Sequence, residues 1–100
     1  MECQPCPICK VPITQIILTQ RIVDVIKKFN PDKNLDNFLI INDNTFPLSK
    51  MKSIMEVPFE QLPPIKVFQY GPNFEVIDGR HRLTRAIIED RKYMNVLICN

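Results

Sequence analysis

One short turn carries the side chains best suited to chemistry. An apolar run ends at Asp78-Gly79, and three basic residues follow at once, Arg80, His81 and Arg82. Glycine permits a positive φ and lets a ligand approach the backbone closely. A helix that begins here would present free N–H groups and the positive end of its dipole, which together attract phosphate. The residues predicted to form this phosphate site are Gly79, Arg80, His81, Arg82 and Arg85.

Each side chain of the turn has a predicted role. Arg82 can grip two oxygens at once through its planar guanidinium, and Arg85, one turn further on, extends the cradle or contacts a nucleic-acid backbone. His81, the single histidine, and Asp78 are the candidate catalytic residues, with Asp78 also expected to cap the helix. The alternative is an ordinary strand-to-helix turn with solvated arginines.

A triphosphate ligand would bring Mg²⁺, so carboxylates near the turn also matter. Strand alternation places residues 76 and 78 on one face of their strand and residues 75 and 77 on the other. We therefore expect Glu75 and Asp78 not to share one metal ion. The sequence shows no tight cluster of carboxylates of the kind a metal-dependent nuclease needs.

A second candidate site lies at the cysteines. The spacing Cys3-x-x-Cys6-x-x-Cys9 resembles one knuckle of a zinc ribbon, and thiolates at this spacing can bind a tetrahedral ion. Cys99 would complete a four-cysteine Zn²⁺ site if the final strand ends nearby, and a second subunit is the other source of a fourth ligand. The alternative is a frayed segment with free thiols. Homo-oligomer formation is left open.

Length and composition indicate one globular domain. One hundred residues suffice for a single modest core. No apolar run approaches the roughly 20 residues of a membrane span, so we expect no membrane partner. The first residues do not read as a signal peptide, which predicts a cytoplasmic or nuclear location. Residues 80–92 hold five basic and two acidic residues, so positive charge gathers at and behind the turn.

The elements that must position these residues alternate between strands and helices. We expect a helix capped by Thr19, with an apolar stripe of Ile22, Val25, Ile26 and Phe29, ending at Asn30. A hairpin and a basic helix follow near the phosphate turn. The predicted fold class is a small α+β domain with a mixed sheet and packed helices. Predicted strands span residues 11–18, 38–41, 65–70, 74–78 and 94–99, and predicted helices span 19–29, 50–56 and 80–91.

The second half of the sequence adds a family resemblance. It reads Leu62-Pro63-Pro64-Ile65-Lys66-Val67, then a hairpin, then Val76-Ile77-Asp78-Gly79-Arg80-His81-Arg82-Leu83. This order of strand, hairpin and strand-to-helix turn resembles the ParB/sulfiredoxin superfamily over about residues 62–98. Sulfiredoxin-like proteins carry a reducing cysteine where this sequence has Arg80, so the resemblance does not imply sulfiredoxin activity. ParB-like proteins hold the triphosphate of a nucleotide, often CTP, at this turn, and some relatives are nucleases.

These observations define the expected protein. Residues 1–10 are a cysteine-rich segment, and residues 11–100 form one ParB/sulfiredoxin-like domain. The domain is expected to bind nucleotide or nucleic-acid phosphate at the turn, with a Mg²⁺-dependent NTPase or phosphotransfer activity left open. The alternatives are a DNA-binding accessory module and a ParB-like nuclease that does not use NTP.

Overall fold

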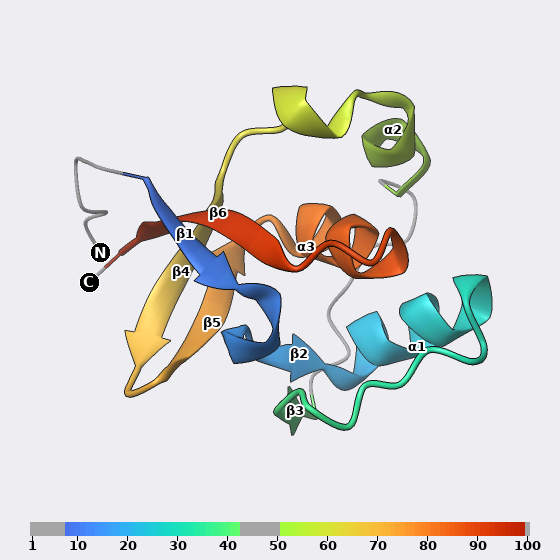
Figure 1. The fold of residues 1–100 in the computed structure, drawn as a ribbon, viewed down its shortest axis with the longest axis horizontal. Helices are drawn as coiled ribbons and strands as arrows, with labels where there is room; N and C mark the ends of the chain where they lie inside the picture. The colour runs from blue at the N-terminus through green and yellow to red at the C-terminus, as the bar shows by residue number, and fades with distance from the viewer. Residues whose placement is uncertain (1–7, 43–50, 100) are drawn as a thin grey trace.

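The computed structural model describes residues 8–42 and 51–99, which form a layer of strands with helices on one of its faces (Figure 1). The four-stranded sheet has the order β1-β6-β4-β5, in which β6 lies antiparallel to β1 and parallel to β4, and β4 lies antiparallel to β5. A two-stranded parallel sheet joins β2 and β3. The strands are β1 (Cys9–Pro12), β2 (Leu18–Thr19), β3 (Ile40–Ile41), β4 (Ile65–Tyr70), β5 (Asn73–Asp78) and β6 (Tyr93–Ile98). The helices are α1 (Gln20–Phe29), α2 (Met51–Glu56) and α3 (Arg80–Ile88), with 3-10 turns η1 (Ile13–Gln15) and η3 (Phe59–Gln61).

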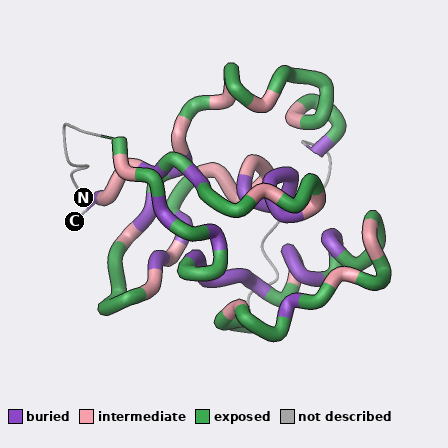
Figure 2. Tube along the Cα trace, in the orientation of Figure 1, coloured by how far each residue is buried: buried purple, intermediate pink, exposed green. Residues whose placement is uncertain are grey.

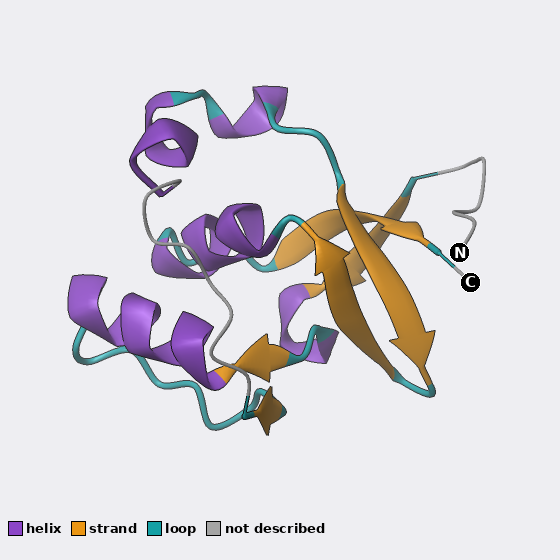
Figure 3. Cartoon of the chain, turned by 180° about the vertical axis from the view of Figure 1, so that it is seen from behind, coloured by secondary structure: helices purple, strands orange, loops and turns teal. Residues whose placement is uncertain are grey.

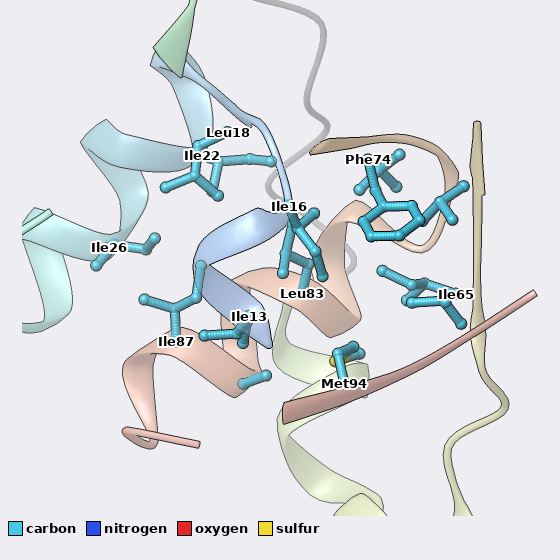
Figure 4. Close-up of a cluster of buried hydrophobic side chains, with 14 of the residues drawn as sticks. Ile13, Ile16, Leu18, Ile22, Ile26, Ile65, Phe74, Leu83, Ile87 and Met94 are labelled. Carbon is cyan, nitrogen blue, oxygen red and sulfur yellow. The ribbon is translucent and has the colours of Figure 1, made fainter. Parts of the chain in front are cut away.

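The predicted α+β class with a mixed sheet is confirmed. Buried and exposed residues alternate along the strands of the larger sheet (Figure 2). The buried residues of these strands join those of the helices in one core cluster, and Figure 3 shows the helices and the larger sheet from behind. Side chains from strands, η1, α1 and α3 meet in one apolar core (Figure 4). Within the described ranges, no helix is long and apolar enough to cross a membrane.

The strand predicted over residues 11–18 is wrong as a continuous strand. β1 ends at Pro12, the chain turns through η1, and β2 begins only at Leu18. In a 3-10 turn, residues three apart lie on the same side, and here Ile13 and Ile16 are both buried in the core. The run of β-branched residues therefore serves core packing through a turn as well as through strands.

The first predicted helix is confirmed, including its cap. α1 spans Gln20–Phe29, and the Thr19 hydroxyl accepts a hydrogen bond from the Ile22 amide at 3.2 Å. The predicted apolar stripe is wrong at its last position, because Phe29 is 56% exposed. Val23 is buried instead. The buried stripe thus lies closer to the start of α1, where the helix packs on the core.

α3 ends earlier than predicted, at Ile88 rather than near residue 91. Asp90 adopts a left-handed backbone with φ of 58°. Its amide donates to the Ile87 carbonyl at 3.1 Å, and the Arg91 amide donates to the Ala86 carbonyl at 3.0 Å. This pair of bonds is a Schellman motif with aspartate in the place that glycine usually takes. The motif ends the helix and turns the chain into β6.

The turn from β5 into α3 depends on Gly79. Its φ is 109° in the left-handed region, where a side chain is strained. A Cβ atom at this position would lie 2.5 Å from Ile65 Cγ2 and 2.9 Å from Ile65 Cβ. Both the backbone conformation and the close approach of β4 therefore require glycine here.

Residues 51–64 are held against α3 by Arg85. This side chain is only 8% exposed, and its Nη1 donates to the carbonyl oxygens of Ile54, at 2.6 Å, and Val57. Its Nε lies 3.2 Å from Glu89 Oε2. The guanidinium also lies 5.6 Å from the centre of the Phe59 ring. One cation therefore connects α2, η3 and α3.

We expect Gly79→Ala to lower the free energy of unfolding by about 2–4 kcal/mol, because it adds backbone strain to a clash with Ile65. Chemical unfolding followed by circular dichroism measures this loss. Gly71→Ala is the matched control: Gly71 also has a positive φ, of 55°, but nothing lies within 4 Å of its added Cβ. Equal losses in the two variants would contradict the role assigned to Ile65.

We expect Arg85→Met to lower the free energy of unfolding by about 2 kcal/mol, since it leaves the carbonyls of Ile54 and Val57 without their charged donor, whereas Glu89 keeps its hydrogen bond from Arg91. Amide hydrogen exchange should rise more in residues 51–61 than in α1. Lys52→Met, an exposed substitution on α2 itself, should leave exchange unchanged. Wild-type exchange rates over residues 51–61 in Arg85→Met would show that other contacts hold this segment.

Candidate phosphate site

The N-terminal ends of α1 and α3 lie beside one small hollow next to β5. The hollow is lined by Thr19 and Ile22 at the start of α1, by Arg80 at the start of α3, and by Glu75 of β5 among others. A bridge between Ile16 and the edge strand β5 brings the two helix ends together, because it carries the chain directly into β2 and α1. Figure 1 shows the two helices starting on the same side of the molecule.

Both helix ends carry positive charge where the helix dipole is already positive. The first turns of α1 and α3 contain no acidic residue. Arg21 stands in the first turn of α1, and Arg80 begins α3. A cation at such a position costs about 0.3–1 kcal/mol through the dipole, and an anion bound there reverses the sign of that contribution. The pair of helix ends is therefore an electropositive site.

Two arginine groups near the helix ends have unused hydrogen-bonding capacity. Arg80 is half-buried, and no carboxylate or other partner of its side chain occurs among the described residues. Arg21 is also half-buried, and its Nε is buried without a hydrogen-bond partner. Gly79 supplies no side-chain cap to the first amides of α3. Sequence reasoning overlooked Arg21, although a cation in the first turn of a helix was the available signal.

Arg82 lies at the turn but has protein partners. Its Nη1 donates to the carbonyl oxygens of Pro63 and Pro64 at 2.9 and 3.0 Å. Its Nη2 lies 3.5 Å from Asp78 Oδ2. Asp78 is thus paired with Arg82, and the predicted capping of α3 by its carboxylate does not occur. The side chain of Arg82 fixes the entry to β4 while its backbone belongs to the turn.

The structure separates the predicted phosphate residues into two groups. Gly79, Arg80 and His81 stand at the start of α3, and His81 is half-buried there. Arg85 faces residues 54–59 and is no part of the hollow. The side chain that the turn leaves most available for a ligand is therefore Arg80.

The strand alternation that predicted opposite faces for Glu75 and Asp78 breaks down at the end of β5. A register shift lies between Lys66 and Val67, so Val67 pairs with Val76 whereas Lys66 pairs with Asp78. If residues alternated regularly after Val76, Asp78 would lie on the buried face of the strand. Asp78 is instead exposed, and it pairs with Lys66, which is also exposed. This β-bulge at the end of β5 reorients the last residue before the turn.

The cysteine site is tested only in part. Cys3 and Cys6 lie outside the described residues. Cys9 begins β1 opposite Val96, and Cys99 follows β6. Cys99 is disulfide-bonded in the structure, and zinc binds cysteine as a thiolate, so its use as a ligand requires the reduced chain. Residues 8–42 and 51–99 contain no group of three potential metal ligands. Zinc binding stays a prediction.

The size of the hollow limits what it can hold. Its volume is about 10 Å³, roughly the space for one water molecule. The hollow is therefore too small to enclose a phosphate group.

Comparison with known proteins gives no family for this chain: no protein-family model and no curated protein matches it.

Proposed function

We propose that this chain binds the phosphate groups of a nucleotide where the N-terminal ends of α1 and α3 meet. The observation that carries the proposal is the pairing of two helix ends that both bear arginine and no carboxylate, beside one hollow. Such an arrangement is unfavourable without an anion and favourable with one. The resemblance of residues 62–98 to the ParB/sulfiredoxin superfamily points to the same turn.

In this proposal Arg80 is the direct phosphate ligand. Its guanidinium has the planar geometry that suits two phosphate oxygens. The amides at the start of α3 would bind a further oxygen, because Gly79 leaves them without a side-chain cap. Arg82 has a positioning role: its hydrogen bonds to the carbonyls of Pro63 and Pro64 hold the residues before β4 next to the turn.

Mg²⁺ would be held mainly by the ligand. Among the described residues that line the hollow, Glu75 is the one carboxylate. Mg²⁺ is commonly bound through one or two carboxylates together with substrate phosphates and water. Glu75 fits that mode, and the ion would neutralise charge on the phosphates.

Binding is better supported than catalysis. Asp78 is paired with Arg82 and exposed, and His81 is half-buried in the first turn of α3. Neither position by itself defines a base aimed at a water molecule, so NTP hydrolysis and phosphotransfer stay predictions. The nuclease alternative has no cluster of potential metal ligands within the described ranges to support it.

The alternative of duplex DNA binding relies on cations that the fold already uses. Arg82 and Arg85 donate to main-chain carbonyls, and Arg91 pairs with Glu89 and Glu60. Affinity for a DNA backbone depends on cations that can neutralise phosphates. Lys92, in the basic stretch of residues 80–92, has no such partner among the described residues. Nucleotide binding is therefore the better proposal.

We expect ATP, CTP, GTP or UTP with Mg²⁺ to raise the unfolding temperature. A ligand present at a hundred times its Kd raises the free energy of unfolding by about 2.7 kcal/mol. For a domain of this size, that raises the unfolding temperature by on the order of 10 °C or more. Differential scanning fluorimetry and calorimetric titration measure the effect. Arg80→Gln should weaken binding about tenfold, equal to about 1.4 kcal/mol.

Lys66→Gln, an exposed substitution on β4, serves as the matched control and should bind like the wild type. Inorganic triphosphate tests whether the phosphates alone suffice. The absence of stabilisation by every nucleotide and by triphosphate would rule the proposal out. Equal binding by Arg80→Gln and wild type would place the ligand elsewhere on the protein.

A further inference from the structure

A second and larger hollow lies away from the start of α3, between residues 59–64 and the beginnings of β1 and β6. Its volume is about 480 Å³, within the range of about 300–1,000 Å³ typical of small-molecule pockets. Its lining includes Lys10 of β1, Phe59 of η3, and Lys92 and Tyr93 at the start of β6. None of these residues belongs to the hollow beside Arg80.

The walls of this pocket are held in place by arginines. Arg82 donates hydrogen bonds to the carbonyl oxygens of Pro63 and Pro64, two residues of the pocket wall. The Arg91 guanidinium lies 3.6 Å from the centre of the Phe59 ring and 3.8 Å from Glu60 Oε1. Contacts of this kind fix both the proline wall and the aromatic wall, so the pocket is formed before any ligand arrives.

The lining combines apolar surface with two ammonium groups that have no carboxylate partner. Leu62, the two prolines and Met94 add apolar surface beside the aromatic rings. Glu60 is the one carboxylate in the described part of the lining, and it pairs with Arg91. No carboxylate lies within ion-pair distance of Lys10 or Lys92 in the described part of the chain.

Strand pairing places the polar groups around the aromatic surface. Lys10 pairs with Asn95 across β1 and β6, and Pro12 pairs with Tyr93. Side chains at i and j−2 of antiparallel strands are diagonal neighbours on one face. Lys10 therefore stands on the same face of the sheet as Tyr93, whose side chain is exposed.

We propose that this pocket binds a small organic anion with a planar apolar ring. The ring lies against the Tyr93, Phe59 and proline surfaces, and the anionic group lies near the ammonium groups of Lys10 and Lys92. An ammonium group is a point charge that accepts a carboxylate, sulfonate or phosphate monoester in many orientations. Two lysines can neutralise one anionic group, whereas a nucleic-acid strand presents many phosphates and would need more cations.

The test uses 2-naphthoate as the planar anion and 2-naphthamide as its neutral counterpart. In ¹⁵N-resolved NMR titrations, naphthoate should shift the amides of Lys10, Phe59 and Tyr93 and leave those of Gly79 and Arg80 unchanged. The neutral amide should bind about tenfold more weakly, because it lacks the charge that the two lysines attract.

The double variant Lys10→Gln/Lys92→Gln should raise the Kd of naphthoate about tenfold and leave the Kd of naphthamide unchanged. Both lysines are exposed, so the variant should keep the wild-type unfolding temperature. Lys66→Gln is again the matched control. Equal affinity for the two probes, or shifts outside the pocket, would overturn the proposal. So would tighter binding of a single-stranded oligonucleotide to the same amides.

A failure of this test leaves the nucleotide site untouched. The two proposals use different lining residues, and Arg80→Gln should not change naphthoate binding. Loss of naphthoate shifts in Arg80→Gln would show that the probe binds at the helix ends, which would also overturn the proposal.

Discussion

The structure depends most on two guanidinium groups of α3, because Arg82 and Arg85 hold residues 51–64 in place. Within that segment only Met51 is buried, with Phe59 packed against the core, so apolar burial contributes only part of its attachment. Both guanidinium groups donate hydrogen bonds to main-chain carbonyl oxygens of this segment. A buried cation without partners is costly, and a segment without a core is loose. Each therefore stabilises the other, and the same segment supplies Phe59 and the two prolines that line the larger pocket.

A division of roles along α3 follows from the same contacts. The side chain at the helix start, Arg80, has no partner among the residues that the structure describes, whereas Arg82 and Arg85 are used by the fold. The dipole of α3 adds to the charge at its start, and α1 adds a second positive end beside it. The start of α3 is thus positively charged, and the larger pocket, which is lined by Lys10 and Lys92, shares no described lining residue with the hollow beside it.

Gly79 connects these features. Its left-handed backbone turns β5 into α3, and the absence of a Cβ lets Ile65 of β4 pack directly against the turn. Packing at this distance brings the entry to β4 within reach of the Arg82 side chain. The bulge just before the turn moves Asp78 out to solvent, where it completes the pairing with Arg82.

Local signals in the sequence determined much of the molecule: the Thr19 cap, the hairpin, and the glycine turn at the start of α3. These features arise from residues close together in the chain, so their types and order suffice to predict them. The sequence also determined which residues stand at the turn from β5 into α3. Tertiary structure alone decided what the arginines bind, because Arg82 and Arg85 find carbonyls 18 to 31 residues away. It likewise decided that the run at residues 11–18 breaks at η1, since core packing of Ile13 and Ile16 outweighs the strand preference of β-branched residues. The physical reason is that cations and apolar side chains take their partners from whatever the fold brings near them, and sequence separation carries no record of that proximity.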